Sequence, residues 1–300
     1  MVKRSKPKLV GYLVVKDEAW IIKDVIASLS EFCDEIVAVD DGSTDGTVEI
    51  LQSFPKVVEL IQHHRKVRKE ASNVNEAMRR AQGRGADWLL RVDADEIFSA
   101  NAVERIPEII AKAPPDVGQF LFVKLNLWRG TEAFRADRPE LYLRWNGWKL
   151  HRNVPGLRWK PATPRLWKRL IKVVLRYERW SAGTYIAGFL EGLRGRSVEV
   201  PDVFLLHYNW CNWERLIKKS MKYTYERKFF YPKRNLEEDI NRQYLKIFDE
   251  SNLILKATHT SWFPEGYRAL LERGESEEER KERERLEGEL NTLAHPWELD

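Results

Sequence analysis

The first hundred residues alternate short apolar runs with segments of helical spacing, and no other feature of the chain constrains its fold as strongly. The apolar runs predict four strands and the segments between them predict three helices: strands at 9–15, 35–39, 57–61 and 88–92, and helices at 19–29, 47–54 and 70–81. Alternation of this kind predicts an α/β fold with a mostly parallel sheet flanked by helices. Because ligands of such open sheets bind beyond the carboxyl ends of the strands, we expect a functional site at that edge.

Composition excludes several classes of protein. Of the 300 residues, 43% are hydrophobic, which is enough to build a core and excludes a wholly disordered chain. The two cysteines exclude a disulfide scaffold. No apolar run approaches the roughly 20 residues that a membrane span needs. The N-terminal apolar run is short and lacks a small-residue cleavage site, so we expect a cytoplasmic chain that begins near Met1.

Charge is unevenly distributed along the chain. The net charge of +5 is too mild to indicate a nucleic-acid binder. Basic residues gather in the segment 166–180, whose spacing predicts a helix that is basic on one face and apolar on another. Such a helix either lies on an anionic membrane or packs on the sheet, and the sequence leaves both readings open.

The pattern of apolar and charged residues along the chain predicts two parts. Residues 1–212 form the first part, in which the segments 8–98 and 117–212 differ in pattern. Residues 213–300 form a C-terminal helical extension that ends in a highly charged tail.

Two carboxylates follow the fourth predicted strand, in Asp93-Ala94-Asp95-Glu96. If this segment is extended, residues i and i+2 face the same way, and the side chains of Asp93 and Asp95 lie side by side. Like charges that close repel one another unless a cation sits between them, and oxygen ligands suit Mg²⁺ or Mn²⁺. The alternative is that the two acids cap the next helix.

A turn rich in glycine and hydroxyl groups follows the second predicted strand. It runs from Asp40 to Thr47 and places Asp41 at the edge of the sheet, where its carboxylate can accept a hydrogen bond from a base N–H or a ribose hydroxyl. An ordinary strand-to-helix turn explains the same residues equally well.

Three motifs together resemble those of the family 2 glycosyltransferases of the GT-A fold, in particular bacterial and archaeal members whose metal motif reads Asp-Ala-Asp-Glu. The resemblance is specific over residues 8–98 and weaker to about residue 213. It implies a catalytic domain at 1–212, with a nucleotide-binding half at 8–98 and an acceptor half at 117–212. The motifs are, in chain order, Val15-Lys16-Asp17-Glu18, Asp40-Asp41-Gly42-Ser43-Thr44-Asp45-Gly46-Thr47 and Asp93-Ala94-Asp95-Glu96.

The resemblance implies roles for individual residues of the donor site. Asp41 is expected to bind the nucleotide base, Asp93 to lie near the ribose and the metal, and Asp95 to be a direct metal ligand. His207 is expected to be a further ligand of the metal, with a hydrogen-bonded core histidine as the alternative. The remaining residues expected to contact the nucleotide sugar are Val14, Lys16, Glu18 and Lys69.

The catalytic base is less well defined by the resemblance. Inverting members use a carboxylate to remove the proton of the acceptor hydroxyl. Asp137 and Glu140 bracket the place where that carboxylate is expected, but Arg138 stands where the family's aspartate would align. The sequence does not choose between the two acids, and each could instead pair with a neighbouring arginine.

The resemblance therefore implies a metal-dependent, inverting glycosyltransferase that uses Mn²⁺ or Mg²⁺. The expected donor is a UDP- or GDP-linked sugar, and the expected acceptor is a glycan or lipid-linked saccharide of the cell surface, with peripheral contact to the inner face of the membrane and no nucleic-acid partner. Two alternatives are an inactive module that binds a sugar nucleotide or docks on a membrane, and a nucleotidyltransferase on a similar sheet. The second would need a Gly-rich phosphate loop after the first strand, where Lys16-Asp17-Glu18 stands instead.

Overall fold

The computed structural model describes residues 6–64, 70–136, 149–161, 187–212, 215–216, 219 and 253–264. The chain divides into two compact units, one of residues 1–124 and 140–206 and the other of residues 125–139 and 207–300. The predicted basic helix at 166–180 lies outside the described residues, and so does most of the predicted C-terminal helical extension. The predicted boundary between residues 212 and 213 stays a prediction.

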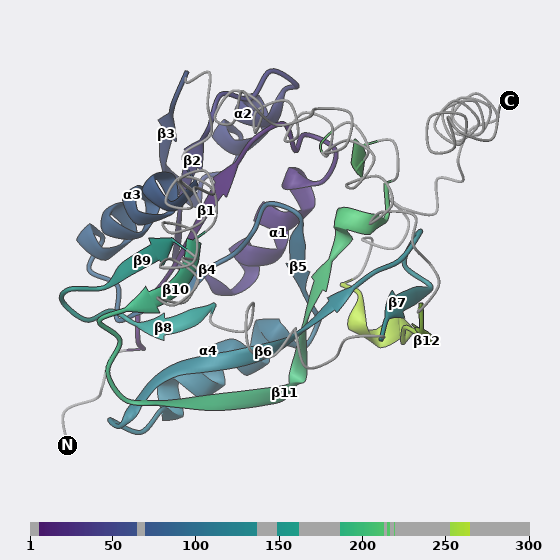
Figure 1. The fold of residues 1–300 in the computed structure, drawn as a ribbon. Coiled ribbons are helices and arrows are strands. Elements are labelled where there is room, and N and C mark those ends of the chain that lie inside the picture. The colour runs from purple at the N-terminus through teal and green to yellow at the C-terminus, as the bar shows by residue number, and fades with distance from the viewer. Residues whose placement is uncertain are drawn as a thin grey trace, which may run out of the picture. The chain divides into compact units, whose positions relative to one another are not determined.

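An eight-stranded sheet in the order β3-β2-β1-β4-β8-β6-β11-β5 forms the frame of the first unit (Figure 1). β1 pairs in parallel with β2 and with β4, and β2 pairs in parallel with β3, as the alternation of strands and helices predicts. β8 breaks this pattern because it runs antiparallel to both β4 and β6. The strands are β1 (Leu9–Val15), β2 (Glu35–Asp40), β3 (Val57–Gln62), β4 (Trp88–Arg91), β5 (Glu96–Phe98), β6 (Val117–Asn126), β8 (Leu150–Arg152) and β11 (Arg196–His207).

Helices lie on both faces of the parallel strands (Figure 1). They are α1 (Ile22–Phe32), α2 (Thr47–Gln52), α3 (Glu70–Gly83) and α4 (Ala102–Lys112). α3 buries its apolar stripe against one face of β1 and β2 in a core cluster that includes Val10, Tyr12, Val37, Val39, Val74, Ala77, Met78 and Ala81. Residues of β1 that alternate with these face the other side, where Gly11 lies against Cys33 at the end of α1.

An antiparallel pair of strands, β9 (Arg158–Pro161) and β10 (Ala187–Glu191), lies beside α3. Trp159 of β9, Leu190 of β10 and Leu157, which directly precedes β9, belong to the same core cluster as α3. The sequence does not predict these strands, because each is short and its apolar residues are too few to show a period.

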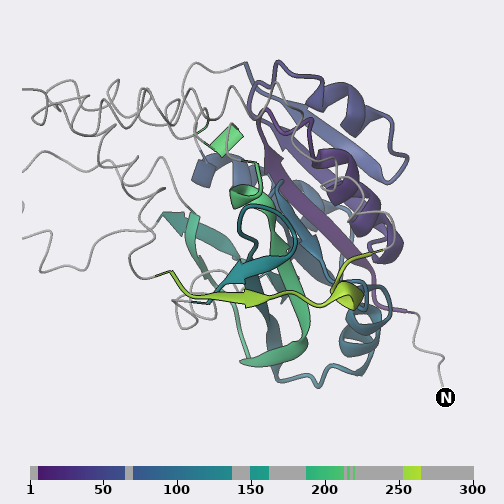
Figure 2. The same ribbon diagram turned by 90° about the vertical axis from the view of Figure 1, so that its right-hand side faces the viewer.

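The second unit contains its own small antiparallel pair, β7 (Ala133–Arg135) and β12 (Leu255–Ala257), which lie side by side in both views (Figures 1 and 2). Two short 3-10 helices, Tyr208–Trp210 and Thr260–Trp262, belong to this unit. Trp128 stacks on Trp210 with ring centroids 5.3 Å apart, and the guanidinium of Arg135 lies 4.7 Å from the centre of the Trp128 ring. No helix in the described part of the chain combines the length and the apolar character that crossing a membrane requires.

Candidate functional site

The loops that leave β1 and β2 are joined by hydrogen bonds. The amide of Asp17 donates to the hydroxyl of Ser43 at 2.9 Å, and the carboxylate of Asp17 accepts from the amide of Thr44 at 2.9 Å. One residue further on, the amide of Glu18 donates to the hydroxyl of Thr47 at 2.9 Å. Two of the motifs singled out in the sequence therefore form one continuous structure at the carboxyl edge of the sheet.

A tight turn after β2 depends on Asp40 and Gly42. The carboxylate of Asp40 accepts hydrogen bonds from the amides of Gly42 and Ser43, both at 3.0 Å. Gly42 has a φ of +86°, and a Cβ atom there would lie 2.9 Å from the carbonyl oxygen of His63. Only glycine combines this left-handed backbone with so close an approach of the neighbouring chain.

Asp41 is held inside this turn in an unusual state. The residue is 1% exposed, and its amide donates to the carbonyl of Val15 at 2.9 Å. Neither oxygen of its carboxylate has a hydrogen-bond partner among the residues that the structure describes, although both are buried. A buried carboxylate without a partner costs free energy, and such groups in native proteins call for an explanation.

The Asp93–Glu96 segment is a turn, which corrects the prediction that it is extended. β4 ends at Arg91, the amide of Glu96 donates to the carbonyl of Asp93 at 3.1 Å, and Glu96 then begins the unpredicted strand β5. The two carboxylates consequently have different environments: the side chain of Asp93 is 37% exposed, whereas Asp95 is 5% exposed. The two acids differ in exposure because the chain turns at this segment. In an extended strand their side chains would point to the same side.

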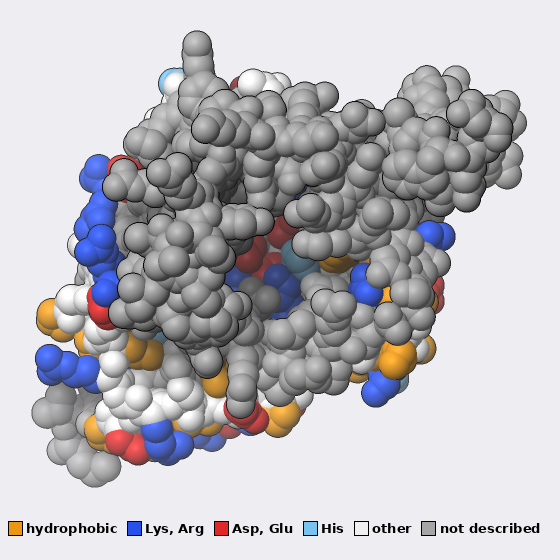
Figure 3. Space-filling model, viewed as in Figure 1, with side chains coloured by type: hydrophobic (Ala, Val, Ile, Leu, Met, Phe, Trp, Pro, Cys, Tyr) orange, Lys and Arg blue, Asp and Glu red, His pale blue; other side chains and the backbone are white. Residues whose placement is uncertain are grey.

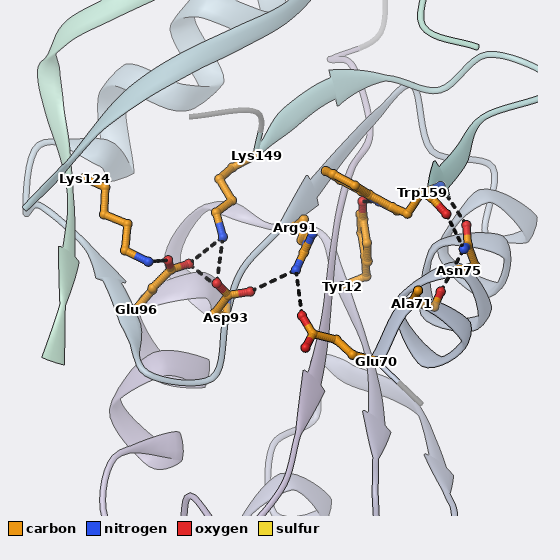
Figure 4. Close-up of polar contacts among 10 residues, drawn as sticks. All are labelled: Tyr12, Glu70, Ala71, Asn75, Arg91, Asp93, Glu96, Lys124, Lys149 and Trp159. Atoms are coloured by element: carbon orange, nitrogen blue, oxygen red, sulfur yellow. Dashed lines mark hydrogen bonds and ion pairs between the residues drawn. The ribbon is translucent and has the colours of Figure 1, made fainter. Parts of the chain in front are cut away.

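A chain of ion pairs surrounds Asp93 (Figure 4). Its Oδ2 atom lies 3.1 Å from the ammonium of Lys149, and its Oδ1 atom lies 3.4 Å from the guanidinium of Arg91. Arg91 also pairs with Glu70 at 3.7 Å and lies over the Trp159 ring at 4.6 Å from its centre. Although burial by itself raises the pKa of Asp93, the charges of Lys149, Arg91 and Lys124 outweigh it and hold the pKa well below its usual value.

Glu96 is fully buried between two lysines (Figure 4). Its Oε1 atom accepts from Lys124 at 2.7 Å, and its Oε2 atom accepts from Lys149 at 2.9 Å. Sequence reasoning did not assign a role to either lysine. A signal was present for Lys124, since a lysine in the middle of the apolar run 119–127 needs an anionic partner if it is buried.

A second buried chain of hydrogen bonds runs beside Arg91. The indole Nε1 of Trp159 donates to the Tyr12 hydroxyl at 2.8 Å, and that hydroxyl then donates to Nε2 of His151 at 3.0 Å. Burial lowers the pKa of His151 to about 4, so the imidazole is neutral and its Nε2 atom can accept. His151 is 0% exposed and belongs to the core.

The other residues predicted for the site have varied positions. Val14 packs against the core cluster of α3, and Glu18 is buried with its carboxylate accepting from the Trp20 indole at 2.9 Å. Lys16 is partly exposed. His207 belongs to the second unit, where its Nδ1 atom lies 2.6 Å from Oδ1 of Asn126. Lys69, Asp137 and Glu140 lie outside the described residues.

A divalent metal ion needs side chains that can act as its ligands. Among the described residues, no three Asp, Glu, His or Cys side chains gather in a way that could hold an ion. Mg²⁺ at nucleotide sites, however, commonly takes only one or two carboxylates and completes its shell with water and substrate phosphates. Asp93 and Asp95 stand two positions apart at one turn, and the chemistry of two carboxylates fits such an ion.

Charged side chains of both signs are exposed on one face of the molecule. In the space-filling view, acidic and basic side chains are visible close to one another near its centre (Figure 3). Such a mixture suits a ligand that carries both anionic groups and hydrogen-bond donors.

Comparison with known proteins adds a family match. Residues 13–160 match the family described as Glycosyl transferase family 2. An uncharacterized glycosyltransferase of Rickettsia bellii is 29% identical over 140 residues, covering 46% of this chain and 44% of the relative. One of Rickettsia typhi is 30% identical over 137 residues, covering 44% of this chain and 43% of the relative. The chain thus spans less than half the length of these curated relatives.

Two solved structures are similar at lower levels of identity. TarS residues 1–349 of Staphylococcus aureus has a TM-score of 0.41 at 14% identity, with 82% of this chain and 73% of that chain covered. Glucosyl-3-phosphoglycerate synthase of Mycobacterium tuberculosis, in complex with Mn²⁺, UDP and glucosyl-3-phosphoglycerate, has a TM-score of 0.38 at 16% identity, with 80% of each chain covered.

Proposed function

Starting from the membership of this chain in glycosyl transferase family 2, which residues 13–160 carry, we propose that it transfers a sugar from a nucleotide diphosphate sugar to an acceptor hydroxyl. The mixed, mostly parallel sheet with helices on both faces is the GT-A fold that the sequence predicts for such an enzyme. The proposal extends to a UDP- or GDP-linked donor, to an inverting mechanism and to a glycan or lipid-linked acceptor.

The observation that carries the proposal is the carboxylate of Asp41, which is buried and has no hydrogen-bond partner within the described part of the chain. A fixed anion at the carboxyl edge of a parallel sheet is ready to accept hydrogen bonds from a base N–H or a ribose hydroxyl. Burying the Asp41 carboxylate without a hydrogen-bond partner costs free energy in the free protein. Because a bound donor would supply that partner and remove this cost, the hydrogen bond would strengthen donor binding. The hydrogen bonds between the loops at Asp17, Ser43 and Thr47 hold Asp41 in place before the donor arrives.

Asp93 and Asp95 would hold a divalent cation, Mn²⁺ or Mg²⁺, with the diphosphate of the donor. When bound, the ion supplies stabilisation of the negative charge that gathers on the departing nucleoside diphosphate. Asp95 is the proposed direct ligand, as the resemblance to the family's Asp-X-Asp motif implies, and Asp93 is proposed to lie near the ribose and the ion. His207 remains a candidate further ligand, and Asp137 and Glu140 remain candidates for the base that activates the acceptor.

The test is a thermal-shift panel of UDP-, GDP- and other nucleotide sugars, each with and without Mn²⁺. A ligand present at 100 times its Kd stabilises the folded protein by about 2.7 kcal/mol, which is a clear rise in melting temperature. We expect one base to stabilise the wild type, with a larger shift when Mn²⁺ is present. Asp95→Ala should lose the effect of Mn²⁺.

Asp41→Asn tests the role of the buried Asp41 carboxylate in the same panel. The variant should lose the shift caused by the nucleotide sugar, while Glu49→Gln, the same chemical change on the exposed side of α2, should keep it. If no nucleotide sugar stabilises the wild type, or if Asp41→Asn binds the donor as well as the wild type does, the proposal is wrong. Binding without donor hydrolysis or transfer to any acceptor would instead identify an inactive sugar-nucleotide-binding module.

A further inference from the structure

Two buried lysines share one carboxylate, but only one of them reaches the Asp-Ala-Asp turn. The side chains of Lys124 and Lys149 are 6% and 5% exposed, and each donates to a different oxygen of Glu96. Lys149 alone also contacts Asp93, at 3.1 Å from its Oδ2 atom (Figure 4). Lys124 and Lys149 are therefore a nearly matched pair of buried cations, and the contact with Asp93 distinguishes Lys149 from Lys124.

We propose that Lys149 is a positioning residue for the donor site, which it serves by fixing the carboxylate of Asp93. The proposal rests on the proposed function, in which Asp93 contacts the nucleotide sugar and its metal. Lys149 lies 56 positions after Asp93 in the sequence, immediately before β8, so its role depends on the pairing of β8 with β4.

The geometry forms a closed ring of three contacts. The amide of Asp93 donates to Oε2 of Glu96 at 2.9 Å, the same oxygen accepts from Lys149 at 2.9 Å, and Lys149 donates to the carboxylate of Asp93. Glu96 thus fixes the main chain of Asp93, and Lys149 fixes its side chain. Charge-assisted hydrogen bonds of this kind are short and directional, which suits them to fixing a carboxylate.

Arg91 completes the clamp but cannot replace Lys149. It approaches the other oxygen of Asp93 at 3.4 Å, and it is shared with Glu70 and with the face of Trp159. Without Lys149, the 37% exposed side chain of Asp93 would keep one long contact on one oxygen and would rotate toward Arg91 or toward solvent. Lys124 cannot compensate, because its hydrogen bond goes to Glu96.

The experiment compares Lys149→Met with Lys124→Met, using the nucleotide sugar that gives the largest thermal shift. Misplacing a group by about 1 Å can cost on the order of 10²-fold in rate, so we expect kcat/KM for donor hydrolysis to fall by about that factor in Lys149→Met. The loss should be mainly in KM for the donor, because Asp93 contacts the donor in both the ground state and the transition state. Lys124→Met should change kcat/KM by much less, and Lys149→Arg should recover part of the loss.

A crystal structure of each variant supplies a readout that does not depend on activity. We expect the Asp93 carboxylate to leave its position in Lys149→Met and to keep it in Lys124→Met. Because removing a buried cation can prevent folding, Lys149→Gln, which removes the charge but keeps a polar side chain and leaves Glu96 to pair with Lys124, is made as well.

Two results would overturn the inference. One is an Asp93 side chain that keeps its position in Lys149→Met or in Lys149→Gln. The other is an equal loss of donor affinity in the Lys124 and Lys149 variants, which would mean that both lysines serve stability alone. If the wild type hydrolyses no nucleotide sugar, the proposed function is at fault, and the position of Asp93 in the variant structures still decides the role of Lys149.

Discussion

The side chain of Asn75 pairs with the main chain of Trp159 as a neighbouring strand would. Its Oδ1 atom accepts from the amide of Trp159 at 2.8 Å, and its Nδ2 atom donates to the carbonyl of the same residue at 2.8 Å (Figure 4). Nδ2 also donates to the carbonyl of Ala71, one turn earlier in α3, at 2.7 Å. One amide thus joins β9 to α3 and places Trp159 where it covers Arg91 and donates to Tyr12.

Asn75→Ala is expected to lower the free energy of unfolding by about 1–3 kcal/mol, because it leaves a partly buried amide and a carbonyl without partners. Urea denaturation should show a lower midpoint with an unchanged m-value. Hydrogen exchange should show the Trp159 amide losing its protection. Gln82→Ala is the control, since Gln82 also bonds from α3 but chiefly to the side chain of Asn153. Equal effects of the two substitutions would contradict the role assigned to Asn75.

Gly42 and Gly46 provide a second matched pair, because both have a left-handed φ near +87° and they differ in the space around them. A Cβ atom at Gly42 would meet the His63 carbonyl oxygen at 2.9 Å, whereas one at Gly46 would meet nothing within 4 Å. Gly46→Ala should cost only about 1–2 kcal/mol for the left-handed backbone. Gly42→Ala should cost more and should also weaken donor binding, because the loop that holds Asp41 must shift. Thermal unfolding together with the nucleotide-sugar panel measures both, and equal losses at the two positions would count against a tight turn at Gly42.

The buried histidine predicts an acid-sensitive stability. The pKa of His151 is about 4 in the folded protein and about 6.5 when unfolded. Between these values the unfolded chain binds a proton that the folded chain does not, so stability is complete above about pH 6.5 and falls as the pH drops toward 4. The loss attributable to His151 is about 3 kcal/mol over that window. His151→Gln should flatten this part of the curve of unfolding free energy against pH, and the exposed His64→Gln should leave it unchanged. A curve equally steep in His151→Gln would mean that other groups carry the acid sensitivity.

The elements that the sequence predicted most closely are those with a long, regular pattern. The strand at 9–15 has the bounds of β1, and the helix at 70–81 ends two residues short of α3. The helix buries one apolar stripe of regular period, and the strand is a nearly continuous apolar run that is buried on both faces; both patterns can be read from the residues alone. Strands of three residues such as β5, β7 and β8 show no period, and the sequence did not predict them.

The sequence by itself determined the parallel half of the sheet and the clustering of acids at its carboxyl edge, because burial and turn formation act over neighbouring residues. Only the tertiary structure decided how those acids are used: a turn separated the environments of Asp93 and Asp95, and lysines 28 and 53 positions after Glu96 came to lie against its carboxylate. Charge pairing of this kind acts through space between strands that are distant in the chain. Local composition carries no record of which strands will be neighbours, so these contacts could be found only once the sheet was in place.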